Sequence, residues 1–243
     1  MTDIKKMIPS WLVNPLRRLR DLLLDPYAVK SYSQEGEDMV LQRIFSEKNQ
    51  GFFVDVGAHH PRRFSNTCLF YRRGWHGINI EPNPESIALF RRERNRDVNL
   101  QMGVSDHLGS MKYYLFNDPA LNSFDRDLAN FRAASTHYKI VGHQDIPVDR
   151  LDNILKKYLP NGVKIDFLSI DAEGLDIKVL QSNDWSMFRP SCVLVESLKT
   201  SIESAMQGEI YRFMKSRGYR LFAKTYNTLF FVETTEGDEG KII

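Results

Sequence analysis

Short apolar strands alternate with helical segments along most of this chain, and this alternation is the feature that most limits its fold. The strands are predicted at residues 52–56, 77–81, 98–102, 165–170 and 192–195. Several of them are apolar throughout, which is typical of strands that are covered on both faces of a sheet. The pattern predicts an α/β fold with a mostly parallel sheet, helices on both faces, and a terminal antiparallel hairpin formed by residues 219–223 and 228–232.

The composition excludes several classes of protein. The chain has 243 residues, 33 Lys and Arg, and 31 Asp and Glu, so its net charge is +2. This balance argues against a general nucleic-acid binder, and we expect no nucleic acid as a partner. Two cysteines, Cys68 and Cys192, are too few for a disulfide scaffold and fit a reducing compartment. With no apolar run of membrane-spanning length and no signal peptide, we expect a soluble, cytoplasmic protein.

The first 30 residues are predicted to form a separate arm. Leucines at helical spacing, interleaved with arginines, predict an amphipathic helix over residues 8–24. Such a helix could contact a membrane surface or form a homodimer, but packing on its own domain is the more common outcome. Residues 31–243 are predicted to form a single domain, with a lid-like insertion around residues 117–146. The helix at 202–217 is predicted to be continuous, and Ser33 is predicted to cap the first helix of the domain.

Four acidic residues lie at the ends of predicted strands, namely Asp55, Glu81, Asp171 and Glu196. In open α/β sheets, ligands bind beyond the carboxyl ends of the strands, so these carboxylates are expected at one crevice. Gly57 permits a tight turn after the first strand. Glu81 lies where a carboxylate can accept both hydroxyls of a ribose. The residues after Gly57 do not supply the further glycines of a dinucleotide-binding loop, which disfavours an oxidoreductase and favours a nucleoside without phosphates.

The segment around Asp171 is the second candidate site. Asp171 and Glu173 could orient a hydroxyl, act as a general base, or hold a metal. A divalent metal shared by Asp171 and Glu196 is possible but is not the leading expectation. Acidic residues at a helix N-terminus also suit the helix dipole, which is the alternative interpretation of Glu173. The polar residues 33–38 could form a loop folded over a ligand.

In their order and spacing, residues 33–38, 53–58, 77–82 and 165–174 resemble the FkbM-type methyltransferases, and the resemblance extends over residues 31–232. It implies a class I methyltransferase (Rossmann-like) fold with a seven-stranded sheet, and S-adenosylmethionine as cofactor. The cofactor-binding residues expected from the resemblance and the strand-end pattern are Gln34, Glu37, Asp55, Gly57, His59, Glu81, Pro82, Ser105, Asp106 and Asp171.

Family members are usually O-methyltransferases, so the resemblance implies methyl transfer to a hydroxyl of a saccharide or sugar-containing precursor. The candidates for a general base are Asp171, Glu173, His60 and His143. Another small hydroxylated metabolite is the alternative acceptor. If the chain is not an enzyme, the alternative hypothesis is a non-catalytic nucleoside-binding α/β protein.

Overall fold

The computed structural model describes residues 15, 25, 27–198 and 200–234. The chain divides into two units, residues 1–31 and residues 32–243. Apart from Pro15, the helix predicted over residues 8–24 lies outside the described residues. No helix in the described part of the chain is both long and apolar enough to cross a lipid bilayer.

The second unit is built on a seven-stranded sheet with the order β3-β2-β1-β7-β8-β10-β9. Its strands are β1 (Phe52–Val56), β2 (His76–Ile80), β3 (Val98–Leu100), β7 (Phe167–Ile170), β8 (Cys192–Glu196), β9 (Tyr219–Lys224) and β10 (Thr228–Glu233). Neighbouring strands from β3 to β8 pair in parallel, whereas β10 is antiparallel to both β8 and β9. The mostly parallel sheet and the terminal hairpin are therefore confirmed. The strand order reverses between β1 and β7, which is where such sheets bind ligands.

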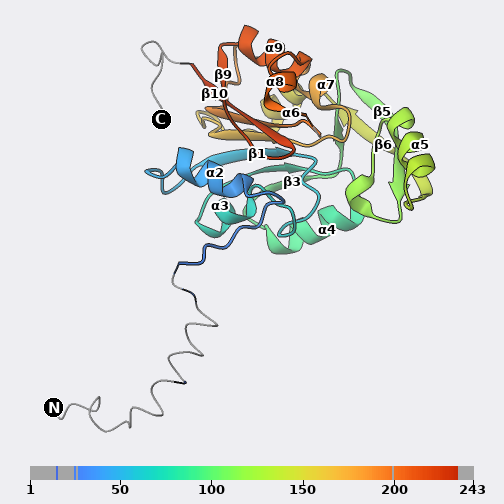
Figure 1. Ribbon diagram of the computed structural model, residues 1–243, viewed down its shortest axis with the longest axis horizontal. Coiled ribbons are helices and arrows are strands. Elements are labelled where there is room, and N and C mark those ends of the chain that lie inside the picture. Colours follow the sequence, from blue (N-terminus) through green and yellow to red (C-terminus); the bar gives the residue numbers. More distant parts are fainter. Residues whose placement is uncertain (1–14, 16–24, 26, 199, 235–243) are drawn as a thin grey trace, which may run out of the picture. The chain divides into compact units, whose positions relative to one another are not determined.

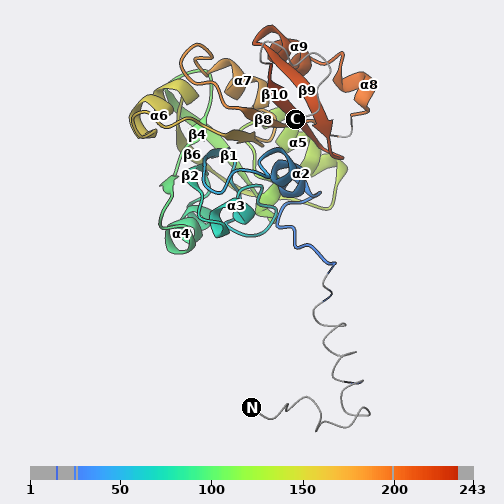
Figure 2. The same ribbon diagram turned by 90° about the vertical axis from the view of Figure 1, so that its left-hand side faces the viewer.

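Apolar residues fill both faces of this sheet, because side chains alternate along each strand. On β1, Val54 and Val56 belong to one core cluster and Phe53 belongs to the other. Helices α6 (Leu151–Tyr158), α7 (Asp176–Gln181) and α9 (Glu209–Ser216) supply the first cluster, and α2 (Glu37–Ile44) and α3 (Cys68–Arg72) supply the second. Both views place α3 and α4 (Pro84–Glu93) on the side opposite α6 and α9 (Figure 1 and Figure 2). Helices on both faces are confirmed.

A second, three-stranded sheet was not predicted from the sequence. It has the order β4-β6-β5 and consists of β4 (Gly103–Val104), β5 (Gly109–Phe116) and β6 (Ile140–Asp149). The 3₁₀-helix η2 (Pro119–Leu121) and helix α5 (Arg126–Ser135) connect β5 to β6. The segment expected as a lid-like insertion, residues 117–146, is thus made of η2, α5 and most of β6. Its action as a lid stays a prediction.

Three local predictions were wrong. The helix predicted over residues 202–217 is two helices, α8 (Ile202–Ala205) and α9, and Gly208 in an extended conformation is the N-cap of α9. The strand predicted at 98–102 ends at Leu100, and β4 begins the other sheet at Gly103. Ser33 is not the N-cap residue of α2, because Gly36 with φ 87° occupies that position; the Ser33 hydroxyl nevertheless accepts from the Asp38 N–H of the first turn at 3.2 Å and donates to Asp38 Oδ1 at 2.9 Å.

Candidate active site

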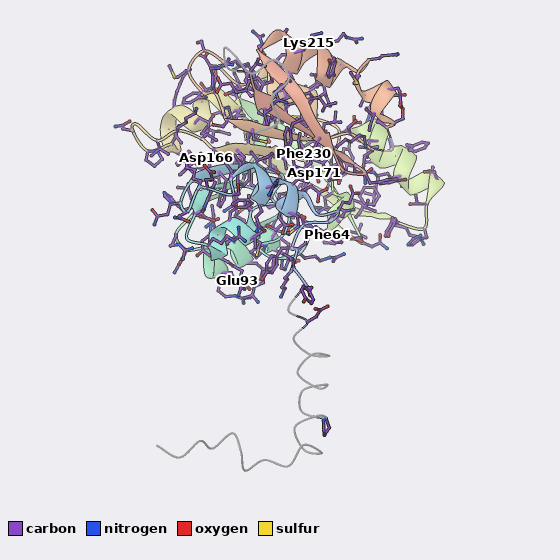
Figure 3. All side chains as sticks on the ribbon, turned by 60° about the vertical axis from the view of Figure 1, so that its left-hand side comes forward. Phe64, Glu93, Asp166, Asp171, Lys215 and Phe230 are labelled. Atoms are coloured by element: carbon purple, nitrogen blue, oxygen red, sulfur yellow. The ribbon has the colours of Figure 1, made fainter. Side chains whose placement is uncertain are left out.

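A cavity lies at the carboxyl edge of the parallel strands, and five carboxylates line it: Asp55, Glu81, Asp171, Glu173 and Glu196. Gln34 from the loop before α2 and residues of the second sheet complete the lining. Figure 3 labels Asp171 near the middle of the molecule and Phe64 below it. Phe64 also lines the cavity and is 40% exposed. The predicted convergence of carboxylates at one edge of the sheet is observed.

Gly57 brings the ends of β1 and β7 into contact. Its φ of 75° lies in the left-handed region that favours glycine. A Cβ atom at this position would lie 1.8 Å from the Asp171 carbonyl oxygen, so no larger residue fits without moving the main chain. Gly57 N–H donates to Ile80 O at 2.9 Å, and Asp171 N–H donates to Val56 O at 3.0 Å. The glycine therefore sets how closely Asp171 approaches the turn after β1.

Glu81 is a buried carboxylate held by two backbone amides. Its Oε2 accepts from His59 N–H at 2.8 Å, and its Oε1 accepts from Asn83 N–H at 2.7 Å. Burial raises the pKa of Glu81 to about 7, although the two amides oppose the shift. Each oxygen keeps capacity for another hydrogen bond. Glu81 can therefore accept two neighbouring hydroxyls, with Pro82 beside it in the lining.

Asp171, Glu173 and Glu196 form a compact carboxylate cluster. Each offers an oxygen that lies within 4.8 Å of the others. Burial raises the pKa of Glu196 to about 9, with further repulsion from Glu173, and burial raises that of Asp171 well above its usual value, with repulsion from Glu196. Like-charged carboxylates at this separation hold protons that isolated ones release. The cluster therefore stores protons near neutral pH.

Arg132 gives one member of the cluster a cationic partner. Its Nη2 lies 2.5 Å from Glu173 Oε2, and it reaches the site from α5. Burial raises the pKa of Glu173, whereas the Arg132 guanidinium lowers it. Negative charge in the cluster is thus best stabilised on Glu173. The three carboxylates supply the oxygen ligands that divalent cations prefer, but Arg132 already occupies one of the Glu173 oxygens.

Strained backbone gathers at the same cavity. Among the described residues, three non-glycine residues have positive φ: His59 at 54°, Phe64 at 54° and Glu173 at 49°. All three line the cavity. Such conformations cost of order 1–3 kcal/mol each and cluster where function requires them. The strain supports this cavity as the functional site independently of its charge.

Five predicted site residues lie outside the cavity lining: Glu37, His60, Ser105, Asp106 and His143. The buried Glu37 carboxylate accepts from the Thr225 hydroxyl at 2.7 Å, and His60 Nδ1 accepts from the Arg62 and Arg63 amides. Ser105 is buried with its hydroxyl 3.2 Å from Asp106 Oδ1, and Asp106 contacts His107. His143 is exposed on β6, opposite Tyr114. A binding or catalytic role for these five residues stays a prediction.

Several lining residues were not predicted from the sequence. The most informative are Arg132, Tyr113 and Asn122, which come from the second sheet and its connection. Burial raises the pKa of Tyr113 well above its usual value, and the Glu81 carboxylate raises it further, so this phenol stays protonated. No local motif marks these residues, because their place in the cavity depends on how the second sheet packs against the first. The sequence offers one general signal: a buried cluster of acidic residues requires a cationic partner, so a basic residue could have been sought for it.

Comparison with known protein families adds an independent finding. A family model described as "Methyltransferase FkbM domain" matches residues 55–221, more than half of the chain. The matched range begins at Asp55 and includes Glu81, Arg132, Asp171, Glu173 and Glu196. A search among curated proteins gave no match.

Proposed function

The chain belongs to the FkbM methyltransferase family, and from this premise we propose that it transfers a methyl group from S-adenosylmethionine to a hydroxyl of a saccharide or sugar-containing precursor. The observation that carries the proposal is the gathering of five carboxylates in one cavity of a chain that this family model matches. A carboxylate-rich cavity suits ligands with many hydroxyl and amino groups, because carboxylates accept hydrogen bonds from both.

The lining residues fit the nucleoside of the proposed cofactor. Glu81 would accept the ribose hydroxyls, as its two oxygens are already aimed by backbone amides. Met102, Val104 and Phe124 offer apolar surface for a base. When bound, the cofactor supplies an activated methyl group on a sulfonium. The protein's task is then mainly to place the acceptor oxygen in line with that methyl group.

Glu173 is the proposed general base. It would accept the proton of the acceptor's hydroxyl on a carboxylate oxygen, while the acceptor's own oxygen would form the new bond to the methyl carbon and the bond from that carbon to the cofactor's sulfur would break, with its electron pair going to sulfur. Its raised pKa makes it a stronger base than an ordinary carboxylate, and Arg132 keeps it charged. Asp171 and Glu196, whose pKa values are raised more strongly by their surroundings, would retain a proton and could donate a hydrogen bond to the acceptor.

The test begins with the cofactor. Thermal-shift titrations are run with S-adenosylhomocysteine and, in parallel, with NAD. We expect only S-adenosylhomocysteine to raise the melting temperature, because a ligand that binds only the native state stabilises it. Labelled S-adenosylmethionine is then offered with a panel of glycosides, and the product is assigned by NMR. An O-methyl sugar supports the proposal. Methylation of a hydroxyl on a molecule without a sugar would show that the acceptor is another small hydroxylated metabolite. Cofactor binding without turnover on any acceptor would indicate a non-catalytic nucleoside-binding protein.

Two further expectations remain proposals. We expect a cytoplasmic location, and we expect the N-terminal arm to contact membrane surfaces or a second copy if it does not pack on its own domain. Light scattering of the full chain measures the oligomeric state, and co-sedimentation with anionic vesicles measures membrane contact. If the protein is a monomer and does not co-sediment with vesicles, the arm neither forms a homodimer nor binds membranes.

A further inference from the structure

Arg94 is a cation buried directly behind the cavity rather than in its lining. The residue is 1% exposed and follows the last turn of α4. Its guanidinium carbon lies 4.8 Å from the ring centroid of Tyr71, 5.5 Å from that of Phe90 and 5.7 Å from that of Phe53. Removing a charge from water is costly unless hydrogen bonds and opposite charge compensate. The partners of Arg94 therefore indicate what its charge does.

These partners connect Arg94 to the cavity through one threonine. Arg94 Nη2 donates to Thr67 Oγ1 at 2.6 Å, and Nη1 donates to Thr67 O at 3.2 Å. Thr67 Oγ1 donates in turn to Asp55 Oδ2 at 2.9 Å. A hydroxyl has a single proton. Ser65 Oγ lies 3.3 Å from the same oxygen, but it can donate its own proton, whereas the Asp55 carboxylate can only accept, so the Thr67 proton points at Asp55.

Charge acts in the same direction as this hydrogen-bond chain. Burial raises the pKa of Asp55, whereas the Thr67 hydroxyl and the Arg94 guanidinium lower it. Asp97 is a second anion near Arg94, with its Oδ2 3.9 Å from Nε, but it also accepts from Gly77 N–H and Asn79 Nδ2 at 3.0 Å each. Arg94 thus helps to keep Asp55 charged at the wall of the cavity.

We propose that Arg94 and Thr67 are positioning residues that hold the Asp55 carboxylate toward the ammonium group of the cofactor's amino-acid part. The inference rests on the proposed function, since it needs a nucleoside that carries an amino acid. Asp55 and Glu81 end neighbouring strands and both line the cavity. Glu81 suits the ribose hydroxyls, so the second carboxylate is available for the cationic end of the same ligand.

Two ligands distinguish this role from a structural one. S-adenosylhomocysteine carries the ammonium group, whereas 5′-methylthioadenosine has the same nucleoside and no amino acid. Isothermal titration of the full chain should show that Thr67→Val weakens S-adenosylhomocysteine binding at least fivefold and 5′-methylthioadenosine binding less than twofold. Arg94→Lys should show the same selectivity, and Thr67→Ser, which keeps the hydroxyl, should bind like the wild type. Arg91→Lys, an exposed site on the same helix, is the matched control.

The outcomes separate this inference from the proposed function. If the wild-type protein binds neither ligand, the proposal of S-adenosylmethionine as cofactor is refuted. Wild-type protein that binds both equally well would show that the ammonium group has no partner, and the inference would fail without any variant. Equal weakening of both ligands by Thr67→Val would assign Thr67 and Arg94 a structural role only. Melting temperatures identify a variant that is misfolded, and because Thr67→Val nearly keeps the side-chain shape, it carries the test if Arg94→Lys does not fold.

Discussion

Cofactor affinity should depend on pH through Glu81. Burial raises the pKa of this carboxyl from 4.5 to about 7, which means that its charged form is destabilised by about 3 kcal/mol in the free folded protein. Because the pKa of Glu81 is raised in the folded state, the contribution of this group to the free energy of unfolding is fully present below about pH 4.5 and is lost as the pH rises through about 7. Ribose hydroxyls would donate to the charged form, so binding should improve over the same range.

The size of the effect follows from the fraction of Glu81 that is ionised. With a pKa of about 7, about a tenth of the free protein carries the charge at pH 6 and about nine-tenths at pH 8. If the charged form binds, the dissociation constant of S-adenosylhomocysteine should fall roughly tenfold between these pH values. Other carboxylates of the cavity also titrate, so the informative quantity is the difference between the wild type and Glu81→Gln.

Isothermal titration from pH 5.5 to pH 8.5 measures this difference. Glu81→Gln should bind more weakly at pH 8 and should lose most of the pH dependence, because the amide does not ionise. Glu85→Gln, an exposed carboxyl in the first turn of α4, should keep the wild-type profile. An unchanged pH profile in Glu81→Gln would refute the assignment of Glu81 to the ribose hydroxyls.

Three further predictions concern the remaining parts of the cavity. Gly57→Ala should destabilise the fold by more than about 1 kcal/mol and abolish ligand binding in denaturation and titration assays, whereas Gly74→Ala, also at positive φ but with open space, should cost only its backbone strain. Arg132→Gln should raise the pKa of Glu173 and shift the acidic limb of the kcat–pH profile upward, and an unmoved limb would remove Glu173 as the base. Methyl transfer should survive EDTA, because Arg132 already neutralises one carboxylate; activity lost on chelation and restored by Mg²⁺ or Mn²⁺ would instead establish a metal at Asp171, Glu173 and Glu196.

The parts of the site that the sequence predicts are those in which local structure decides position. Asp55, Glu81 and Asp171 each lie at the carboxyl end of a strand that is recognisable from its apolar residues, and parallel pairing brings the ends of these strands to one edge. Gly57 follows from the same logic, since the chain must turn there. The family resemblance adds the cofactor, and the family match supports it.

The parts that the sequence does not predict depend on contacts between distant segments. Arg132 meets Glu173 across 41 positions, and nothing near either residue indicates the pair. Glu37 looks like a ligand-binding acid beside Gln34, but its carboxylate turns to Thr225. His143 lies on β6 with its side chain exposed, outside the cavity lining, and its predicted catalytic role stays a prediction. The direction of the side chain, which residue type does not reveal, decides whether such a residue lines the cavity.

The loop that carries Gln34 is fastened by the last hairpin of the chain. Glu35 accepts from the Asn227 amide and side chain at 2.7 Å, and Asn227 itself lines the cavity. These partners are 192 positions apart, so closing the contact has a high entropic cost and belongs late in folding. On the ribosome, the early strands can pair while this wall of the cavity is still missing. A nascent chain should therefore acquire full cofactor affinity only after residue 227 has emerged, so ligand binding would report that the hairpin of β9 and β10 has joined the sheet.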